Sequence, residues 1–96
     1  MTNESTCAAL DDGRLIRNDR PRVSYAETKR RLISYSSDYG KSWTKYKYDN
    51  ELITPICHAS MMSFATGDPA SGSVLLFANP ASTETRIAMT VRTSKD

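Results

Sequence analysis

Short runs of apolar residues, separated by polar turns, follow one another along the whole chain. The strands that they predict are 6–10, 14–17, 31–36, 43–48, 60–64, 74–78 and 86–93. The 43–48 segment alternates aromatic and polar residues, as a half-buried strand does, whereas the continuous apolar run 74–78 indicates a strand buried on both faces. No stretch keeps a 3.6-residue period between helix caps, so we expect little helix.

The order of strands and turns occurs twice, and a turn motif marks the repeat. Residues 36–43 read Ser-Ser-Asp-Tyr-Gly-Lys-Ser-Trp, and Ser94 and Asp96 begin a second copy of this motif at the end of the chain. A repeat of about 50–60 residues with about four short antiparallel strands is typical of a β-propeller blade. We therefore expect an all-β chain with about two blades, at about 5–50 and 58–96, the second cut inside its turn motif. Because blades bury their faces against neighbouring blades, two alone should be marginally stable.

Each letter of the turn motif has a structural task. Asp38 can accept hydrogen bonds from main-chain N–H groups a few residues on, and Gly40 can take a positive φ without steric cost. Trp43 supplies a large apolar body that can pack beneath the turn. Ser36 and Ser42 are small polar residues that can complete its hydrogen bonding. We therefore expect the motif, in both copies, to be structural and not catalytic.

Charge and composition exclude several classes of function. The 13 basic and 11 acidic residues are spread along the chain and leave a net charge of +2. This balance indicates no nucleic-acid partner and no polybasic membrane patch. The longest apolar run is too short to span a bilayer, and the polar start of the chain has no signal-peptide core. The densest basic run is predicted to lie in a solvated loop and comprises Arg22, Lys29, Arg30 and Arg31.

The two cysteines and the single histidine do not have the spacing of a metal site. Because a structural zinc ion normally takes four protein ligands, we expect no bound metal, and no other cofactor is indicated. The sequence leaves open whether Cys7 and Cys57 form a disulfide.

The turn motif and the start of the chain resemble one protein family. Residues 36–43 match the Asp-box, Ser-x-Asp-x-Gly-x-Ser/Thr-Trp, of the sialidase (neuraminidase) superfamily. Because Asp-boxes also occur in other propellers, the surrounding segments carry much of the resemblance. Asn-Glu-Ser at 3–5, Leu-Asp-Asp-Gly-Arg-Leu at 10–15 and Asn-Asp-Arg at 18–20 resemble the Asn-Glu-Ser, Leu-x-Asp-Gly-x-Leu and Asn-x-Arg segments of bacterial exo-sialidases.

The second half carries further resemblances, in the order that the family has them. Residues 55–60 read Pro-Ile-Cys-His-Ala-Ser and are similar to the family's Pro-x-Cys-Gln-Ala-Ser, with His58 at the glutamine. Residues 75–82, followed by Arg86 and by Thr-Val-Arg at 90–92, resemble Leu-Leu-Phe-Ser-Asn-Pro-x-Ser, Arg and Thr-Val-Arg. The chain is thus similar to an internal fragment of an exo-α-sialidase with Asp-box repeats.

The resemblance implies a six-bladed β-propeller of antiparallel four-stranded blades, about two of which are present. Such proteins remove terminal sialic acid from glycoproteins, glycolipids and oligosaccharides, so sialylated glycans are the implied partners. The rest of the propeller is needed to cover the faces of the blades. For the parent protein, the resemblance implies a secreted or cell-surface location.

Three residues match the family's principal site residues. Sialic acid carries a carboxylate on its anomeric carbon, and the family holds it with three arginines, whose guanidinium groups suit carboxylate geometry. Arg20 resembles the second arginine and Arg86 the third, whereas the first precedes the region seen here. Glu4 resembles the catalytic glutamate that takes the proton of the family's tyrosine nucleophile. Arg92 lies in a matching segment, but we expect it to be structural.

The family's other catalytic groups have no match. The tyrosines, none of which lies in the nucleophile's motif, are Tyr25, Tyr35, Tyr39, Tyr46 and Tyr48. Neither Asp11 nor Asp12 matches the acid/base aspartate. The resemblance therefore implies part of a retaining exo-α-sialidase whose tyrosine lies outside this chain, with no turnover by the chain alone. Two alternatives stay open: a non-catalytic glycan-binding Asp-box module and an inactive truncated product.

Overall fold

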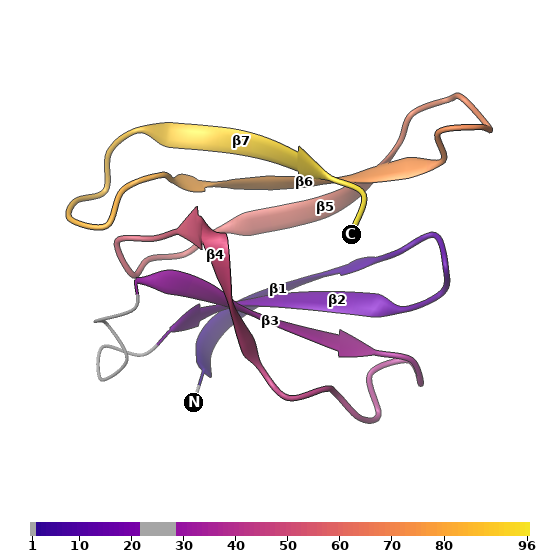
Figure 1. Ribbon diagram of the computed structural model, residues 1–96, viewed down its shortest axis with the longest axis horizontal. Helices are drawn as coiled ribbons and strands as arrows, with labels where there is room; N and C mark the ends of the chain where they lie inside the picture. Colours follow the sequence, from indigo (N-terminus) through magenta and orange to yellow (C-terminus); the bar gives the residue numbers. More distant parts are fainter. Residues whose placement is uncertain (1, 22–28) are drawn as a thin grey trace.

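The computed structural model describes residues 2–21 and 29–96, in which antiparallel strands form two sheets (Figure 1). The strands of sheet A, in spatial order, are β1 (Thr2–Ala9), β2 (Leu15–Pro21), β3 (Arg30–Ser36) and β4 (Lys47–Ile53). Those of sheet B are β5 (Ser60–Ala65), β6 (Ser73–Pro80) and β7 (Met89–Ser94). These described ranges contain no helix, and hence none that is long and apolar enough to cross a membrane.

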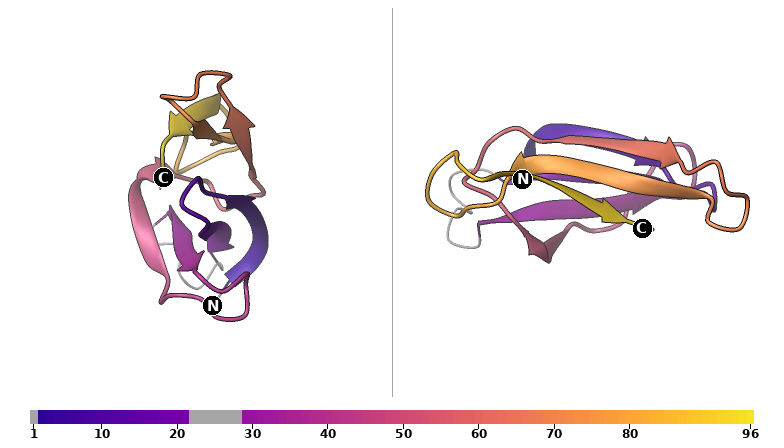
Figure 2. Two further views of the ribbon diagram at one scale, coloured as in Figure 1. Left: turned by 90° about the vertical axis from the view of Figure 1, so that its right-hand side faces the viewer. Right: turned by 90° about the horizontal axis from the view of Figure 1, so that it is seen from above.

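Sheet B lies against one face of sheet A (Figures 1 and 2). The hydrophobic core lies between the two sheets. Its buried residues are Leu10, Ile16, Ile33 and Leu75, the last of them from sheet B. Polar contacts also cross from one sheet to the other. Asn79 Nδ2 donates to Ile53 O (2.9 Å), and Met61 N donates to Thr6 Oγ1 (3.2 Å). Face-to-face packing of this kind is how neighbouring propeller blades bury their apolar residues.

Strand β6 is buried on one face only, so the prediction that 74–78 is buried on both faces was wrong. Leu75 and Phe77 face sheet A and are buried, whereas Leu76 is only partly buried. The register places Leu76 beside Met62 of β5, which is 54% exposed. The continuous apolar run did not predict this alternation in burial, because the same apolar sequence can form a strand with one exposed face or a strand with both faces covered.

The predicted strand at 43–48 was also placed wrongly, since β4 begins only at Lys47. Before it, Thr44 N donates to Tyr35 O (2.8 Å), which holds the chain beside β3. The rings of Trp43 and Tyr46 lie 4.8 and 4.9 Å from the guanidinium of Arg17. Trp43 and Tyr46 therefore pack around a cation and do not lie in a strand.

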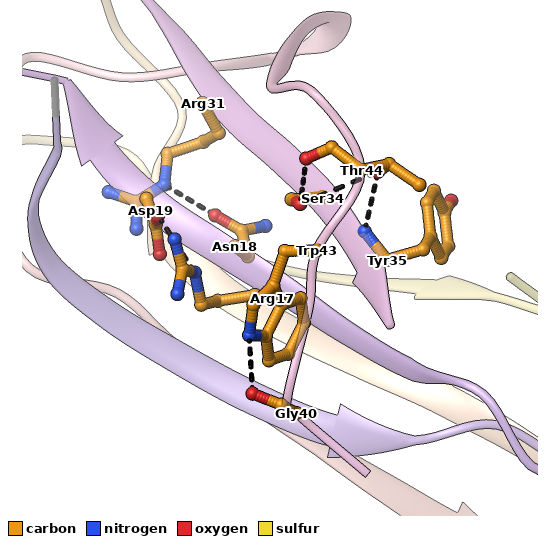
Figure 3. Close-up of polar contacts among 9 residues, drawn as sticks. All are labelled: Arg17, Asn18, Asp19, Arg31, Ser34, Tyr35, Gly40, Trp43 and Thr44. Atoms are coloured by element: carbon orange, nitrogen blue, oxygen red, sulfur yellow. Dashed lines mark hydrogen bonds and ion pairs between the residues drawn. The ribbon is translucent and has the colours of Figure 1, made fainter. Parts of the chain in front are cut away.

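The Asp-box turn is closed by side-chain hydrogen bonds. Asp38 accepts from the amide of Ser42 (2.8 Å) and from its hydroxyl (2.5 Å), and Ser36 Oγ donates to Asp38 (2.8 Å). Gly40 takes a φ of +87°, and its carbonyl accepts from Trp43 Nε1 (3.1 Å; Figure 3). The Ser42 hydrogen bonds are the main cause that lowers the pKa of Asp38 to about 2.

The second copy of the motif, which begins at Ser94, makes one of the same hydrogen bonds as the Asp-box at 36–43. Asp96 N donates to Ser94 Oγ (3.1 Å), as Asp38 N donates to Ser36 Oγ (3.4 Å). Strand β7 leads directly into this second copy, as β3 leads into the first. The same local chemistry therefore ends corresponding strands of the two sheets.

Replacing Asp38 with asparagine tests the contribution of the Asp-box to stability. Because the pKa of Asp38 is lowered from 3.8 to about 2, its stabilisation is complete above about pH 4 and lost as the pH falls toward 2. We expect Asp38→Asn to unfold at a lower temperature at pH 7 and to lose stability less steeply below pH 4. Circular dichroism melting at several pH values measures both effects. The exposed Glu51→Gln serves as the control. An unchanged acid profile in the Asp38 variant would contradict the assignment.

Candidate functional site

The site begins with a contact between Glu4 on β1 and Arg20 on β2. Thr2 pairs with Pro21 and Ser5 with Asp19, so β1 has one extra residue between these pairs. This irregularity is a β-bulge, a feature that often redirects a side chain beside a functional site. Glu4 lies at the bulge, and Arg20 Nη1 is 3.1 Å from its Oε2.

The Glu4–Arg20 pair is open to solvent on the carboxylate side. The side chain of Glu4 is 44% exposed and that of Arg20 is 21% exposed. The hydrogen bond from Arg20 is the largest cause that holds the pKa of Glu4 below its ordinary value, and partial burial opposes it. Arg20 Nε is buried and has no hydrogen-bond partner in the described chain. The pair thus places a charged carboxylate at the surface beside a guanidinium whose buried Nε has no partner in the described chain.

A third group, His58, reaches the same carboxylate from the linker between β4 and β5. Its Nδ1 lies 3.7 Å from Glu4 Oε2, the oxygen that Arg20 also contacts. The resemblance marked His58 only as a departure from glutamine and gave it no role. Its proximity to Glu4 depends on the packing of the linker, which has no local signal in the sequence.

Arg31 on β3 holds this linker through a hydrogen bond to its backbone. Its Nε donates to Asn18 Oδ1 (2.7 Å; Figure 3) and its Nη1 donates to Cys57 O (2.8 Å). The residue is 1% exposed. Burial lowers the pKa of Arg31 to about 10, so the guanidinium stays charged at neutral pH. Its cation also lies 5.7 Å from the centre of the Phe77 ring in sheet B.

The prediction of a solvated basic loop was therefore wrong for Arg31. Strand alternation puts it on the same face as the core residue Ile33, and its hydrogen bonds compensate for lost hydration. Lys29 and Arg30 are partly buried, and Arg30 begins β3. Arg22 lies outside the described residues.

Arg86 lies in the loop 81–88 between β6 and β7 and is exposed, although a strand was predicted from this residue onward. Figure 1 shows this loop at the end of the sheets where β1 begins and β2 ends. An ion pair between Lys29 Nζ and Glu84 Oε1 (3.4 Å) ties the loop to the start of β3. The structure brings Glu4 and Arg20 into direct contact and leaves Arg86 outside that contact.

The other residues singled out in the sequence lie away from this pair. Arg92 Nη1 donates to Glu51 O (2.7 Å) and so connects β7 with β4, as a structural residue does. The Asp-box turn is at the opposite end of sheet A (Figure 1). Cys7 is exposed and Cys57 is buried, and the two do not form a disulfide.

A hollow of about 150 Å³ between the sheets is separate from the Glu4–Arg20 pair. Its walls include core residues such as Ile16 and Leu75 together with polar residues such as Asp49 and Arg92. Neither Glu4, Arg20 nor Arg86 lines it. The hollow is thus a gap in the packing between the sheets, and the charged pair lies at their end.

Two stacked antiparallel sheets, each leading into an Asp-box sequence, define adjacent blades of an Asp-box β-propeller. The opposite end of these blades carries the bulge with Glu4 and Arg20.

No protein-family model matches the chain. It is 35% identical over 94 residues to the exo-alpha-sialidase of Arthroderma benhamiae, covering 98% of this chain and 21% of that protein. It is 29% identical over 97 residues to a sialidase of Bacteroides fragilis, covering 99% of this chain and 17% of the relative. The match to a sialidase of Micromonospora viridifaciens is 33% over 97 residues, with coverages of 98% and 14%.

The structure is similar to that of the Hadza microbial sialidase Hz136, with a TM-score of 0.81 and 28% identity. That match covers 99% of this chain and 18% of the solved chain. The chain is therefore a relative of the sialidases, with the fold of about two blades of their β-propeller. It spans about a fifth or less of the length of these relatives.

Replacing Arg31 with methionine tests whether it holds the linker to sheet A. The change leaves the acceptors on Asn18 and Cys57 without this donor, so we expect a loss of about 1–3 kcal/mol in the free energy of unfolding. Denaturant titration of the protein measures the loss. Arg86→Met, at an exposed arginine, is the matched control and should change stability by less than about 0.5 kcal/mol. Equal effects of the two changes would contradict the role given to Arg31.

Proposed function

We propose that this chain is the part of an exo-α-sialidase that supplies Glu4, Arg20 and Arg86 to the sialic acid site. The observation that carries the proposal is the 3.1 Å contact between Glu4 and Arg20 at the β1 bulge. It joins an acid and a cation from different strands at the solvent-exposed end of the sheets. The relatives named sialidase supply the reaction class.

The two arginines bind the carboxylate of sialic acid in this proposal. Arg20 is held in place by Glu4, while its buried Nε has no partner in the described chain. A guanidinium stays charged at all relevant pH values and can donate two parallel hydrogen bonds to a carboxylate. Arg86 adds a second guanidinium from the 81–88 loop at the same end of the sheets (Figure 1). A further arginine from outside this chain completes the set.

Glu4 acts as a proton acceptor for a tyrosine nucleophile from outside this chain. A phenol is a weak nucleophile at neutral pH, because its pKa is near 10, and a carboxylate within hydrogen-bond reach can take its proton during attack. A neutral phenol also approaches the anionic sugar without the repulsion that a carboxylate nucleophile would meet. The tyrosine attacks the anomeric carbon, a separate acid protonates the leaving oxygen, and water then releases the sugar with retained configuration.

The substrates in this proposal are sialylated glycans on glycoproteins, glycolipids and free oligosaccharides. The blades at about 5–50 and 58–96 contribute one sector of the six-bladed ring, and the remaining blades supply the missing catalytic groups. The chain by itself therefore lacks turnover. The parent protein acts outside the cell or at its surface, where such glycans occur.

Activity of the full-length protein that contains this chain tests the proposal. With a fluorogenic sialoside, we expect Arg20→Met to lower kcat/KM by about 100- to 1000-fold and Glu4→Gln to lower kcat by about 100- to 10,000-fold. Arg20→Lys, which keeps the charge but loses the planar fork, should recover only part of the loss. Arg14→Met, at the opposite end of sheet A, is the control.

Two results would contradict the proposal. Saturable binding of the sialoside without hydrolysis would indicate the glycan-binding module. Hydrolysis that is unaffected by the Glu4 and Arg20 changes would show that the site lies elsewhere.

A further inference from the structure

We propose that His58 is a positioning residue that makes the proton affinity of Glu4 depend on pH. The inference rests on the function proposed above, in which Glu4 accepts a proton and Arg20 binds the substrate carboxylate. It starts from two contacts on one oxygen: His58 Nδ1 and Arg20 Nη1 lie 3.7 and 3.1 Å from Glu4 Oε2.

The linker presents His58 to Glu4 because the residues on both sides of it are fixed. Cys57 is 7% exposed and Ala59 is 4% exposed, whereas the His58 side chain is 65% exposed. The carbonyl of Cys57 accepts from the buried Arg31 (2.8 Å). Before it, Ile56 N donates to the hydroxyl of the fully buried Thr54 (3.2 Å). The backbone is thus anchored, and only the imidazole at this point of the linker extends outward beside Glu4.

The imidazole of His58 differs in kind from the other cations near Glu4. In the described chain, the positive groups that act on Glu4 are Arg20 on β2, Arg31 on β3 and His58 in the linker. Arginines keep their charge, whereas an imidazole gains or loses a proton between about pH 5 and 8. A glutamine at this position, as in the similar stretch of bacterial exo-sialidases, would stay neutral throughout.

Protonation of His58 has two opposite effects on the proposed reaction. The imidazolium places a second cation at Glu4 Oε2, so Glu4 holds a proton less readily and assists the tyrosine less. The same charge lies beside Arg20 and attracts the anionic sugar. Acidification should therefore tighten substrate binding and slow the chemical step, so both KM and kcat fall. Because the groups are solvent-exposed, each effect should be modest, about two- to fivefold.

Kinetics of His58→Gln in the full-length protein test this inference. We expect the variant to show a KM and a kcat about two- to fivefold higher than the wild type near pH 5, and the same values as the wild type near pH 8. A purely structural role of His58 predicts equal changes at both pH values. Equal changes, or none, would overturn the inference. Thermal melting checks the fold, and His58→Asn replaces the variant if His58→Gln fails to fold.

Binding of N-acetylneuraminic acid separates this inference from the proposed function. Calorimetry should show that His58→Gln weakens binding of the free acid about two- to fivefold near pH 5 only, and that the uncharged methyl ester shows no such difference. This result in a protein without hydrolysis would overturn the proposed function but support an attraction between the His58 charge and the bound acid. Hydrolysis that depends on Arg20 and Glu4, with no pH-dependent effect of His58, would overturn the role of His58 alone.

Discussion

The burial of one guanidinium, that of Arg31, connects the packing of the sheets with the geometry of the site. Arg31 lies on β3 at the boundary between the sheets, where it donates to Asn18 on the neighbouring strand and to Cys57 in the linker. A buried cation is tolerated only where hydrogen bonds replace its lost hydration, so this position fixes the path of the linker over sheet A. The same path places His58 at Glu4.

Much of the fold could be predicted, because its signals are local. Alternating apolar residues and glycine turns predicted strands that overlap β1, β2, β3, β5 and β6, although β1 begins earlier and β2 ends later than predicted. The resemblance to sialidases was confirmed by the relatives and by the solved structure. The Asp-box turn could be predicted because Asp38 and Gly40 shape the backbone only a few residues away from them in the sequence. The strand predicted over the aromatic segment at 43–46 was wrong for the opposite reason, since the partner of these aromatic residues, Arg17, lies far away in the sequence.

The site was only partly readable from the sequence. Glu4 and Arg20 were identified by resemblance and are in contact in the structure. The bulge that brings them together arises from the pairing of β1 with β2, and no sequence motif predicted it. Arg31 was assigned to solvent because a run of basic residues suggests exposure, whereas strand alternation buried one member of the run. The role of Arg86 in binding the substrate stays a proposal. Its exposed loop lies at the same end of the sheets as Glu4 and Arg20, but Arg86 takes no part in the contact between them.

In the proposed function, Arg20 and Glu4 form one end of a sialic acid site. A crystal structure of the full-length protein with bound N-acetylneuraminic acid shows whether they do. We expect the sugar carboxylate to lie about 2.7–2.9 Å from guanidinium nitrogens of Arg20, with Glu4 on the side of the anomeric carbon. A sugar bound elsewhere on the propeller, with Arg20 and Glu4 facing solvent, would show that these two residues do not form the site.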